Sequence, residues 1–306
     1  MCRVVGYLGR PIALSSILYA TDSSLVRQAY SPRMMATYLN LAGFGIAAWD
    51  PGSFTPDKPF TYKVTTLPVF DRNLRSLAEK IAPSCLLAHV RGVTDSEDEV
   101  ISEQNLHPFR YRDVPVTLAH NGHLREFARM KHDVVARVRP ELARRVEGTT
   151  DSEWIYALLL SQLRDPFSLP SATELADATV STLSILSDVR ARHGIDTSSP
   201  ANLFVCTGRT LIATRFSYDY GWYPDDDYML ETDLPYVSLW YTFGDDYLEV
   251  DGEWVMVGDG PPSSVMIASE PLTTDTSTWL EAPEYSILTA SLDNGTLRSE
   301  IADLEI

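Results

Sequence analysis

The sequence predicts an α+β fold. Strand patterns fill much of the first 120 residues and recur after Pro200, and two strong helix patterns lie between them. Contacts between the early and the late strands would give one shared core rather than two separable units. We therefore expect residues 1–306 to form a single domain, and a chain of this length can bury a substantial core.

The first half contains four short apolar segments that read as buried strands. Each is bounded by Gly, Pro or polar residues, which is typical of strands buried on both faces. The segments are RVVGYL, FGIAAW, CLLAHV and VPVTLAH.

Three segments show helical spacing. Residues 71–82 place Leu74, Leu77 and Ile81 on one face, and residues 148–163 carry a longer apolar face. In the second segment Thr150 and Glu153 have the spacing of a capping box. The third helix is expected over residues 172–192, closed by Gly194.

After Pro200 the pattern returns to strands, interrupted by one unusual stretch. The strand segments are NLFVCTG, TLIATRF, YVSLWYTF, EWVMVGD, SSVMIAS and YSILTAS. Residues 217–247 are rich in Tyr, Trp and Asp, which is too aromatic for a disordered acidic tail. We interpret this stretch as a long ordered acidic aromatic insertion that lines a substrate cleft, covers one, or forms a subunit interface.

Charge and composition exclude several classes of function. The formal net charge is −17, whereas nucleic acid and anionic membranes attract concentrated Lys and Arg. No apolar run approaches the roughly 20 residues of a membrane span, and the start lacks the pattern of a signal peptide. The three cysteines are widely spaced, so Cys85 and Cys206 are expected to be packing residues. These features predict a cytoplasmic protein.

Several polar motifs could carry chemistry, although each has an ordinary explanation. The tripeptide of His120, Asn121 and Gly122 is commonly a turn, and Arg91 after an apolar strand is commonly a salt-bridged rim residue. Asp151 near a helix start commonly caps the helix or offsets its dipole. Cys2 directly after Met1 is by itself a weak signal.

In this order and spacing the motifs resemble the class II glutamine amidotransferases, a branch of the N-terminal-nucleophile (Ntn) hydrolases. The phrases LYxxxxSLVRQ, NxHPF, AHNG and ASEPLT are similar to a compact subgroup without a synthetase domain. That subgroup includes a γ-glutamyl hydrolase of ergothioneine synthesis and a fungal amidotransferase of glutathione breakdown. The resemblance implies a four-layer αββα sandwich and hydrolysis of a γ-glutamyl amide, with no metal or organic cofactor.

The resemblance also assigns roles to particular residues. Cys2 would be the nucleophile once Met1 is removed, and Asn121 with Gly122 would stabilise the oxyanion. The substrate-binding positions would be Arg91 for the α-carboxylate, Asp151 for the α-ammonium group, and Thr94 beside them. Glutamine or another γ-glutamyl small molecule would be the substrate, and a separate synthetase or peptidase subunit is a candidate partner.

Elementary chemistry explains why these residue types suit the reaction. An amide carbon is a poor electrophile, so the site needs a strong nucleophile and donors for the oxyanion. The α-amine of an N-terminal cysteine titrates near about 7.7–8.0, so a neutral fraction can accept the thiol proton. Arginine fits a carboxylate with two hydrogen bonds, and the side-chain amide of Asn121 can donate to a developing negative charge.

Two other classes of function remain open on the sequence alone. A non-catalytic member of the same fold could serve as a binding or assembly subunit. A metal-dependent hydrolase would need three or four converging ligands, but no HExxH or CxxC pattern is present. We therefore predict structural roles for His89 and His120, with His107 and His120 as candidates for supporting the site from behind.

Overall fold

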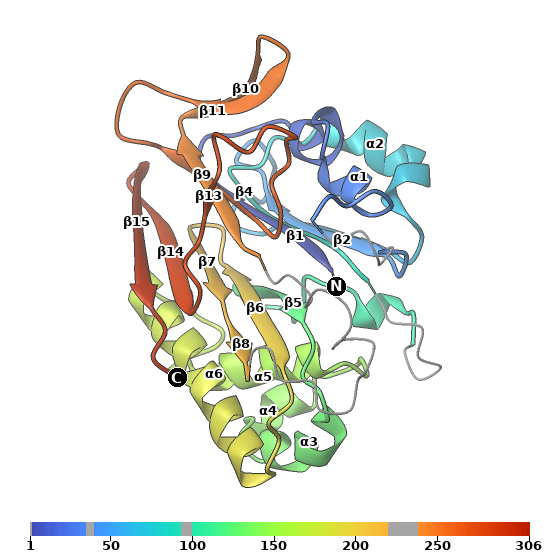
Figure 1. Ribbon diagram of the computed structural model, residues 1–306, viewed down its shortest axis with the longest axis vertical. Coiled ribbons are helices and arrows are strands. Elements are labelled where there is room, and N and C mark those ends of the chain that lie inside the picture. The colour runs from blue at the N-terminus through green and yellow to red at the C-terminus, as the bar shows by residue number, and fades with distance from the viewer. Residues whose placement is uncertain (1, 35–39, 93–99, 220–237) are drawn as a thin grey trace.

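The fold consists of two stacked β-sheets with helices on both outer faces (Figure 1). The computed structural model describes residues 2–34, 40–92, 100–219 and 238–306. Thr94 and residues 220–237 of the predicted insertion lie outside this part of the chain. None of the helices in these ranges is both long and apolar enough to cross a membrane.

Among the described residues, seven strands form the first sheet, in the order β13-β9-β12-β1-β4-β2-β3. Every neighbouring pair is antiparallel. The strands are β1 (Arg3–Leu8), β2 (Phe44–Trp49), β3 (Phe60–Val64), β4 (Cys85–Val90), β9 (Trp240–Gly244), β12 (Ser264–Ala268) and β13 (Leu280–Glu281).

The second sheet has the order β15-β14-β7-β6-β5, with the short β8 paired to β6. Its strands are β5 (Thr117–Gly122), β6 (Ser199–Cys206), β7 (Thr210–Arg215), β8 (Ser217–Tyr218), β14 (Ser286–Asp293) and β15 (Thr296–Asp303).

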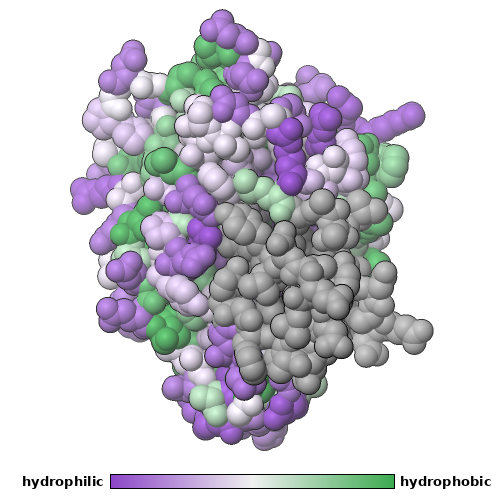
Figure 2. Space-filling model, viewed as in Figure 1, coloured by the Kyte–Doolittle hydropathy of each residue, from purple (hydrophilic) through white to green (hydrophobic). Residues whose placement is uncertain are grey.

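A separate hairpin projects from the body of the molecule. It consists of β10 (Asp246–Val250) and β11 (Glu253–Val257), which pair only with each other among the described strands. Figure 2 shows hydrophobic residues at the end of the molecule where Figure 1 places this hairpin. Leu248 and Val250 are exposed there.

The helices cover the outer faces of the two sheets. The first sheet carries η1, a π-helical turn, together with the 3-10 turn η2 and the helices α1 and α2; the second carries α3 to α6 (Figure 1). The 3-10 turn η3 precedes β5 in the chain. The bounds are η1 (Ser16–Ala20), α1 (Leu25–Gln28), η2 (Pro68–Phe70), α2 (Arg72–Ala78), η3 (Glu103–Asn105), α3 (Phe127–Val135), α4 (Pro140–Ala143), α5 (Asp151–Gln162) and α6 (Ala172–Arg192).

Three buried clusters correspond to the three interfaces between these layers. One fills the space between the sheets and includes Val4, Leu87, Ala119 and Phe204. The other two lie between each sheet and its own helices. The layers therefore run helix, sheet, sheet, helix, and the predicted four-layer αββα sandwich is confirmed.

The helix of residues 172–192 is confirmed at both ends. Ser171 caps its start by accepting from the N–H of Glu174, and Gly194 follows its end at a φ of +60°. The N–H of Ile195 returns to the carbonyl of Arg190 and closes the last turn. The helix expected over residues 71–82 is shorter, because the chain turns after Ala78 so that the carbonyl of Ile81 can accept from Leu14.

The capping box predicted for α5 is wrong. Thr150 is the N-cap residue, but its hydroxyl makes no capping bond. Glu153 instead accepts from the N–H groups of Glu147 and Gly148, at 3.1 and 2.6 Å. The Glu153 carboxylate thus bonds to the loop before the helix and not to the N–H of Thr150.

The sequence patterns predicted the central strands correctly and did not predict several of the edge strands. Edge strand β15 is exposed along most of its length, so its sequence carries little apolar signal. Edge strand β3 is only half-buried. Within residues 217–247, β8 and β9 belong to the two sheets, and the extent of the predicted insertion stays a prediction.

Candidate active site

Cys2 directly precedes β1, a central strand of the first sheet, and its side chain is buried. Side chains alternate along a strand, so Cys2 shares the face of Val4 and Leu8, which pack between the sheets. Its Sγ accepts from the N–H of Gly92 at 3.3 Å. Burial raises the pKa of the Cys2 thiol, against the lowering effects of Gly92 and the nearby arginines.

Arg91 lies beside Cys2. The register of β1 and β4 pairs Arg3 with Val90, and its continuation by one residue places Cys2 opposite Arg91. The buried Arg91 continues the alternation of Cys85 and Leu87, so its side chain also faces the space between the sheets. Its Nη1 donates to the carbonyl of Val100 at 3.1 Å.

Asn121 reaches the same space from the second sheet. It shares the face of Ala119, which packs between the sheets, and β5 lies against β1 and β4. The Asn121 side chain is buried, yet it makes no hydrogen bond to any described residue, and its Oδ1 is fully enclosed. Buried amides are normally paired, so this free amide is one of the exceptions that needs an explanation.

Gly122 ends β5 where a second chain segment comes very close. A Cβ atom at this position would lie 1.9 Å from the carbonyl oxygen of Pro200 and 2.5 Å from Nε2 of His120. Any larger residue would push β5 away from Pro200. The structure therefore gives a packing reason for glycine here, independent of any role in chemistry.

Asp151 is the first residue of α5, and its side chain is only 10% exposed. Its Oδ2 accepts from the N–H of Leu124 at 2.6 Å, and Oδ1 accepts from the hydroxyl of Ser152 at 3.0 Å. His123 lies 3.8 Å from the same carboxylate. Asp151 thus ties the start of α5 to the segment that follows Gly122.

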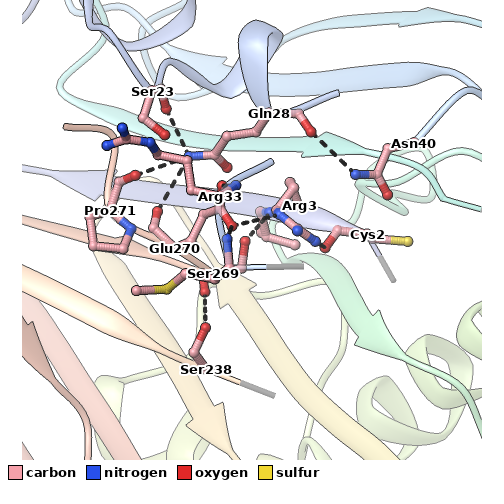
Figure 3. A network of polar contacts seen from close by, with 12 residues as sticks. Cys2, Arg3, Ser23, Gln28, Arg33, Asn40, Ser238, Ser269, Glu270 and Pro271 are labelled. Atoms are coloured by element: carbon pink, nitrogen blue, oxygen red, sulfur yellow. Dashed lines mark hydrogen bonds and ion pairs between the residues drawn. The ribbon is translucent and has the colours of Figure 1, made fainter. Parts of the chain in front are cut away.

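A buried ion pair fixes the residue after Cys2 (Figure 3). Arg3 Nε lies 3.2 Å from Glu270 Oε2, with both side chains nearly inaccessible, and Arg3 Nη1 donates to the carbonyl of Cys2. The Glu270 carboxylate also accepts from the N–H groups of Arg33 and Met34. Figure 3 shows the Cys2 sulfur pointing away from this network.

Sequence reasoning did not assign a role to Arg3 or Glu270. A signal was available, because an arginine inside the apolar strand pattern RVVGYL requires a buried acid as partner. Gln28 extends the same network by donating to the carbonyls of Ser23 and Pro271, at 2.8 and 3.1 Å. The phrases SLVRQ and ASEPLT therefore meet in the fold and anchor the strand that carries Cys2.

Three buried histidines lie near the site, close to Arg91 or Asp151. The rings of His89 and His107 stand 4.2 Å apart, and His120 contacts the Ser152 hydroxyl and the Pro200 carbonyl at 2.9 and 3.2 Å. Burial lowers the pKa of all three, to about 3 for His89. The backbone contact expected of His120 is present. The ring nitrogens of His89 meet hydrogen-bond geometry with no described residue, although the His120 backbone lies close.

We expect the free energy of unfolding to fall as the pH drops below about 6.5. An unfolded histidine takes up a proton there, whereas His89 stays neutral down to about pH 3. His89 alone should then cost about 2 kcal/mol between pH 6.5 and 5.0. Urea unfolding at both pH values should show a smaller loss for His89→Gln and an unchanged loss for the exposed control His132→Gln. An identical loss in wild type and His89→Gln would contradict the neutral His89.

Cys85 and Cys206 face each other across the two sheets. Both are completely buried free thiols, and their sulfur atoms are 2.9 Å apart. They lie in the cluster between the sheets, as expected for packing cysteines. In the described ranges, no group of three or more His, Cys, Asp or Glu residues is arranged to hold a metal ion.

Comparison with known proteins places the chain in a family. Residues 13–299 match the family model described as "Glutamine amidotransferases class-II". A relative in Saccharomyces cerevisiae, named "Probable glutamine amidotransferase DUG3", is 29% identical over 94% of this chain and 81% of its own length. A second relative, "Gamma-glutamyl-hercynylcysteine sulfoxide hydrolase" of Mycobacterium tuberculosis, is 32% identical over 40% of this chain and 49% of its own.

A solved structure agrees with the fold. A glutamine aminotransferase class-II domain protein from Silicibacter pomeroyi superposes with a TM-score of 0.63 at 20% identity, and both chains are covered completely. Similarity at this level of identity supports the architecture of the sandwich. The family match covers nearly the whole chain, and this protein belongs to the class II glutamine amidotransferases.

Proposed function

We propose that the protein hydrolyses the γ-amide bond of glutamine or of a γ-glutamyl compound through a thioester on Cys2. The observation that carries this proposal is the meeting of Cys2 and Arg91 with the unpaired Asn121 amide in the space between the sheets. Membership of the family and the names of both relatives support the same bond class.

The nucleophile of this proposal needs its own base. Burial raises the pKa of the Cys2 thiol, so the thiol is protonated at neutral pH. After removal of Met1, the α-amine of Cys2 could take that proton while Sγ attacks the γ-carbonyl carbon. The amine then protonates the departing ammonia or amine, and water hydrolyses the thioester to glutamate and free thiol.

The tetrahedral oxyanion would be held by Asn121 and Gly122. The Asn121 side chain is buried and its Oδ1 has no partner among the described residues, and its N–H2 group is the proposed donor to the oxyanion. The backbone N–H of Gly122 is the proposed second donor.

Arg91 is proposed to bind the α-carboxylate of the substrate, and Asp151 is proposed to bind its α-ammonium group. Both side chains are largely buried and carry opposite charges. Thr94 is retained as a proposed substrate contact from the sequence alone. His107 and His120 would hold neighbouring residues of the site in position, because both are buried and His120 is hydrogen-bonded on both ring nitrogens.

A panel of γ-glutamyl compounds tests the proposed bond class. Protein shown by mass spectrometry to begin at Cys2 should release glutamate from glutamine or from at least one γ-glutamyl amine. α-Glutamyl isomers should stay intact, because their scissile carbonyl would lie away from Cys2 when the head is bound. Release from the α-isomers, or from none of the panel, would refute the proposal.

Three broader assignments accompany this function. We propose that residues 1–306 form one amidotransferase domain, since the family match spans 13–299 and strands from both halves share each sheet. We also propose a cytoplasmic location, which the free thiols support. A separate synthetase or peptidase subunit is the proposed partner if the released ammonia or amine is used rather than discarded.

A further inference from the structure

A cavity of about 340 Å³ lies between β3, the segment before β5 and the segment after α4. Phe109 and Tyr111 form its apolar wall. None of the described residues proposed above for hydrolysis lines it, so its contents are a separate question. Its volume lies within the range of small-molecule sites, about 300–1,000 Å³.

The cavity is basic although the chain is strongly acidic. Five cationic side chains line it, against two carboxylates, in a protein of net charge −17. The cations come from separate stretches of sequence and converge only in the fold; they are Lys63, Arg110, Arg112, Arg144 and Arg145. Of the two carboxylates, Glu153 is committed to the N–H groups of Glu147 and Gly148.

Two buried polar atoms on the cavity lining meet hydrogen-bond geometry with no described residue. They are Nε of Arg110 and the hydroxyl of Tyr111, a residue only 8% exposed, although the Glu153 carboxylate lies close to that hydroxyl. An unpaired buried donor is costly unless something else accepts from it. Both groups can donate to an oxyanion.

Lys63 adds a partly buried ammonium group at the same place. Its Nζ donates to the carbonyl of Leu106 at 2.6 Å and stands 5.4 Å from the Phe109 ring centroid, and it forms no salt bridge within the described ranges. Burial lowers the pKa of Lys63 to about 8. The carboxylates of Glu153, Glu103 and Glu147 offset this charge from a distance, and a bound anion would supply a direct counter-charge.

We propose that the cavity binds the oxyanion group of a small molecule, a phosphate or a carboxylate, with Arg110, Tyr111 and Lys63 as its direct contacts. The exposed Arg112 and Arg144 at the rim would attract the anion and add little to its orientation. The proposal does not depend on the hydrolysis assigned to Cys2.

Isothermal titration calorimetry at constant ionic strength tests this site with two probes, inorganic phosphate and citrate, against sodium chloride as the control. We expect saturable binding of one probe per chain. Tyr111→Phe removes only a hydroxyl that meets hydrogen-bond geometry with no described residue, so the melting temperature should change little while the affinity falls about tenfold or more. Arg110→Gln should weaken binding at least as much, and the exposed control Arg137→Gln should not change it.

The two probes separate the possible sources of the anion. Tighter binding of phosphate would point to a phosphorylated ligand, and tighter binding of citrate to a polycarboxylate. The proposal is overturned if neither probe saturates, or if Tyr111→Phe and Arg110→Gln bind as wild type does. A merely structural role for Tyr111 predicts that second result.

Discussion

Cys2→Ala is expected to lower glutamate release by on the order of 10⁴–10⁶-fold, as removal of a covalent nucleophile does in other hydrolases. The fold should survive, because Cys2 directly precedes β1 and the Arg3–Glu270 pair that anchors the strand is untouched. Discontinuous glutamate detection with purified protein measures the rate, and thermal melting measures the fold.

Two further variants separate the roles of the thiol and the amine. Cys85→Ala is the matched control, since it also removes a buried thiol but lies away from Arg91 and Asn121 in the packed layer between the sheets. It should lose stability and keep its turnover. A lysine inserted between Met1 and Cys2 would block trimming and leave an amide nitrogen in place of the base. That protein should be as inactive as Cys2→Ala. Normal turnover by Cys2→Ala would rule out Cys2 as nucleophile, and normal turnover by the insertion variant would rule out its α-amine as the base.

The sequence predicted best those elements whose signals are local. Helix α6 has its cap at Ser171 and its stop at Gly194 within the same short stretch, so both ends were readable. Edge strand β15 was missed because most of its side chains face water and need no apolar pattern. The capping-box prediction was wrong because Glu153 accepts from two N–H groups in the loop before the helix instead of from the N–H of Thr150.

The surroundings of the site depend on contacts between distant residues, which periodicity cannot reveal. Arg3 and Glu270 lie far apart in the chain, and only the fold makes them partners. The same is true of the cavity, whose basic residues come from several segments. Asp151 was weighed as a helix cap or a substrate ligand, and the structure adds a third contact, to the N–H of Leu124.

Because Asp151 already contacts Leu124, the question is whether it also binds the amino-acid head of the substrate. If Arg91 and Asp151 hold the α-carboxylate and the α-ammonium group, glutaramate, which lacks the ammonium group, should react about 10²–10⁴-fold more slowly than glutamine in kcat/KM. The physical reason is that a largely buried charge left without its partner costs about 3–5 kcal/mol. Arg91→Lys should also raise KM for glutamine, because lysine cannot form the two-pronged contact.

The Asp151 variant distinguishes substrate recognition from support of the loop. Asp151→Asn keeps an oxygen that can accept from Leu124, so the segment after Gly122 should hold and the melting temperature should change little. Its KM for glutamine should rise sharply. Its rate on glutaramate should stay near that of the wild type, because glutaramate has no ammonium group for either protein to contact. Glu141→Gln, which neutralises an exposed acid in the first turn of α4, is the matched control and should behave as wild type. If Asp151 only ties α5 to the Leu124 segment, Asp151→Asn keeps that tie and will change little on either substrate, and wild type will not discriminate between them. That outcome would remove Asp151 from the binding site and leave the assignment of Cys2 intact.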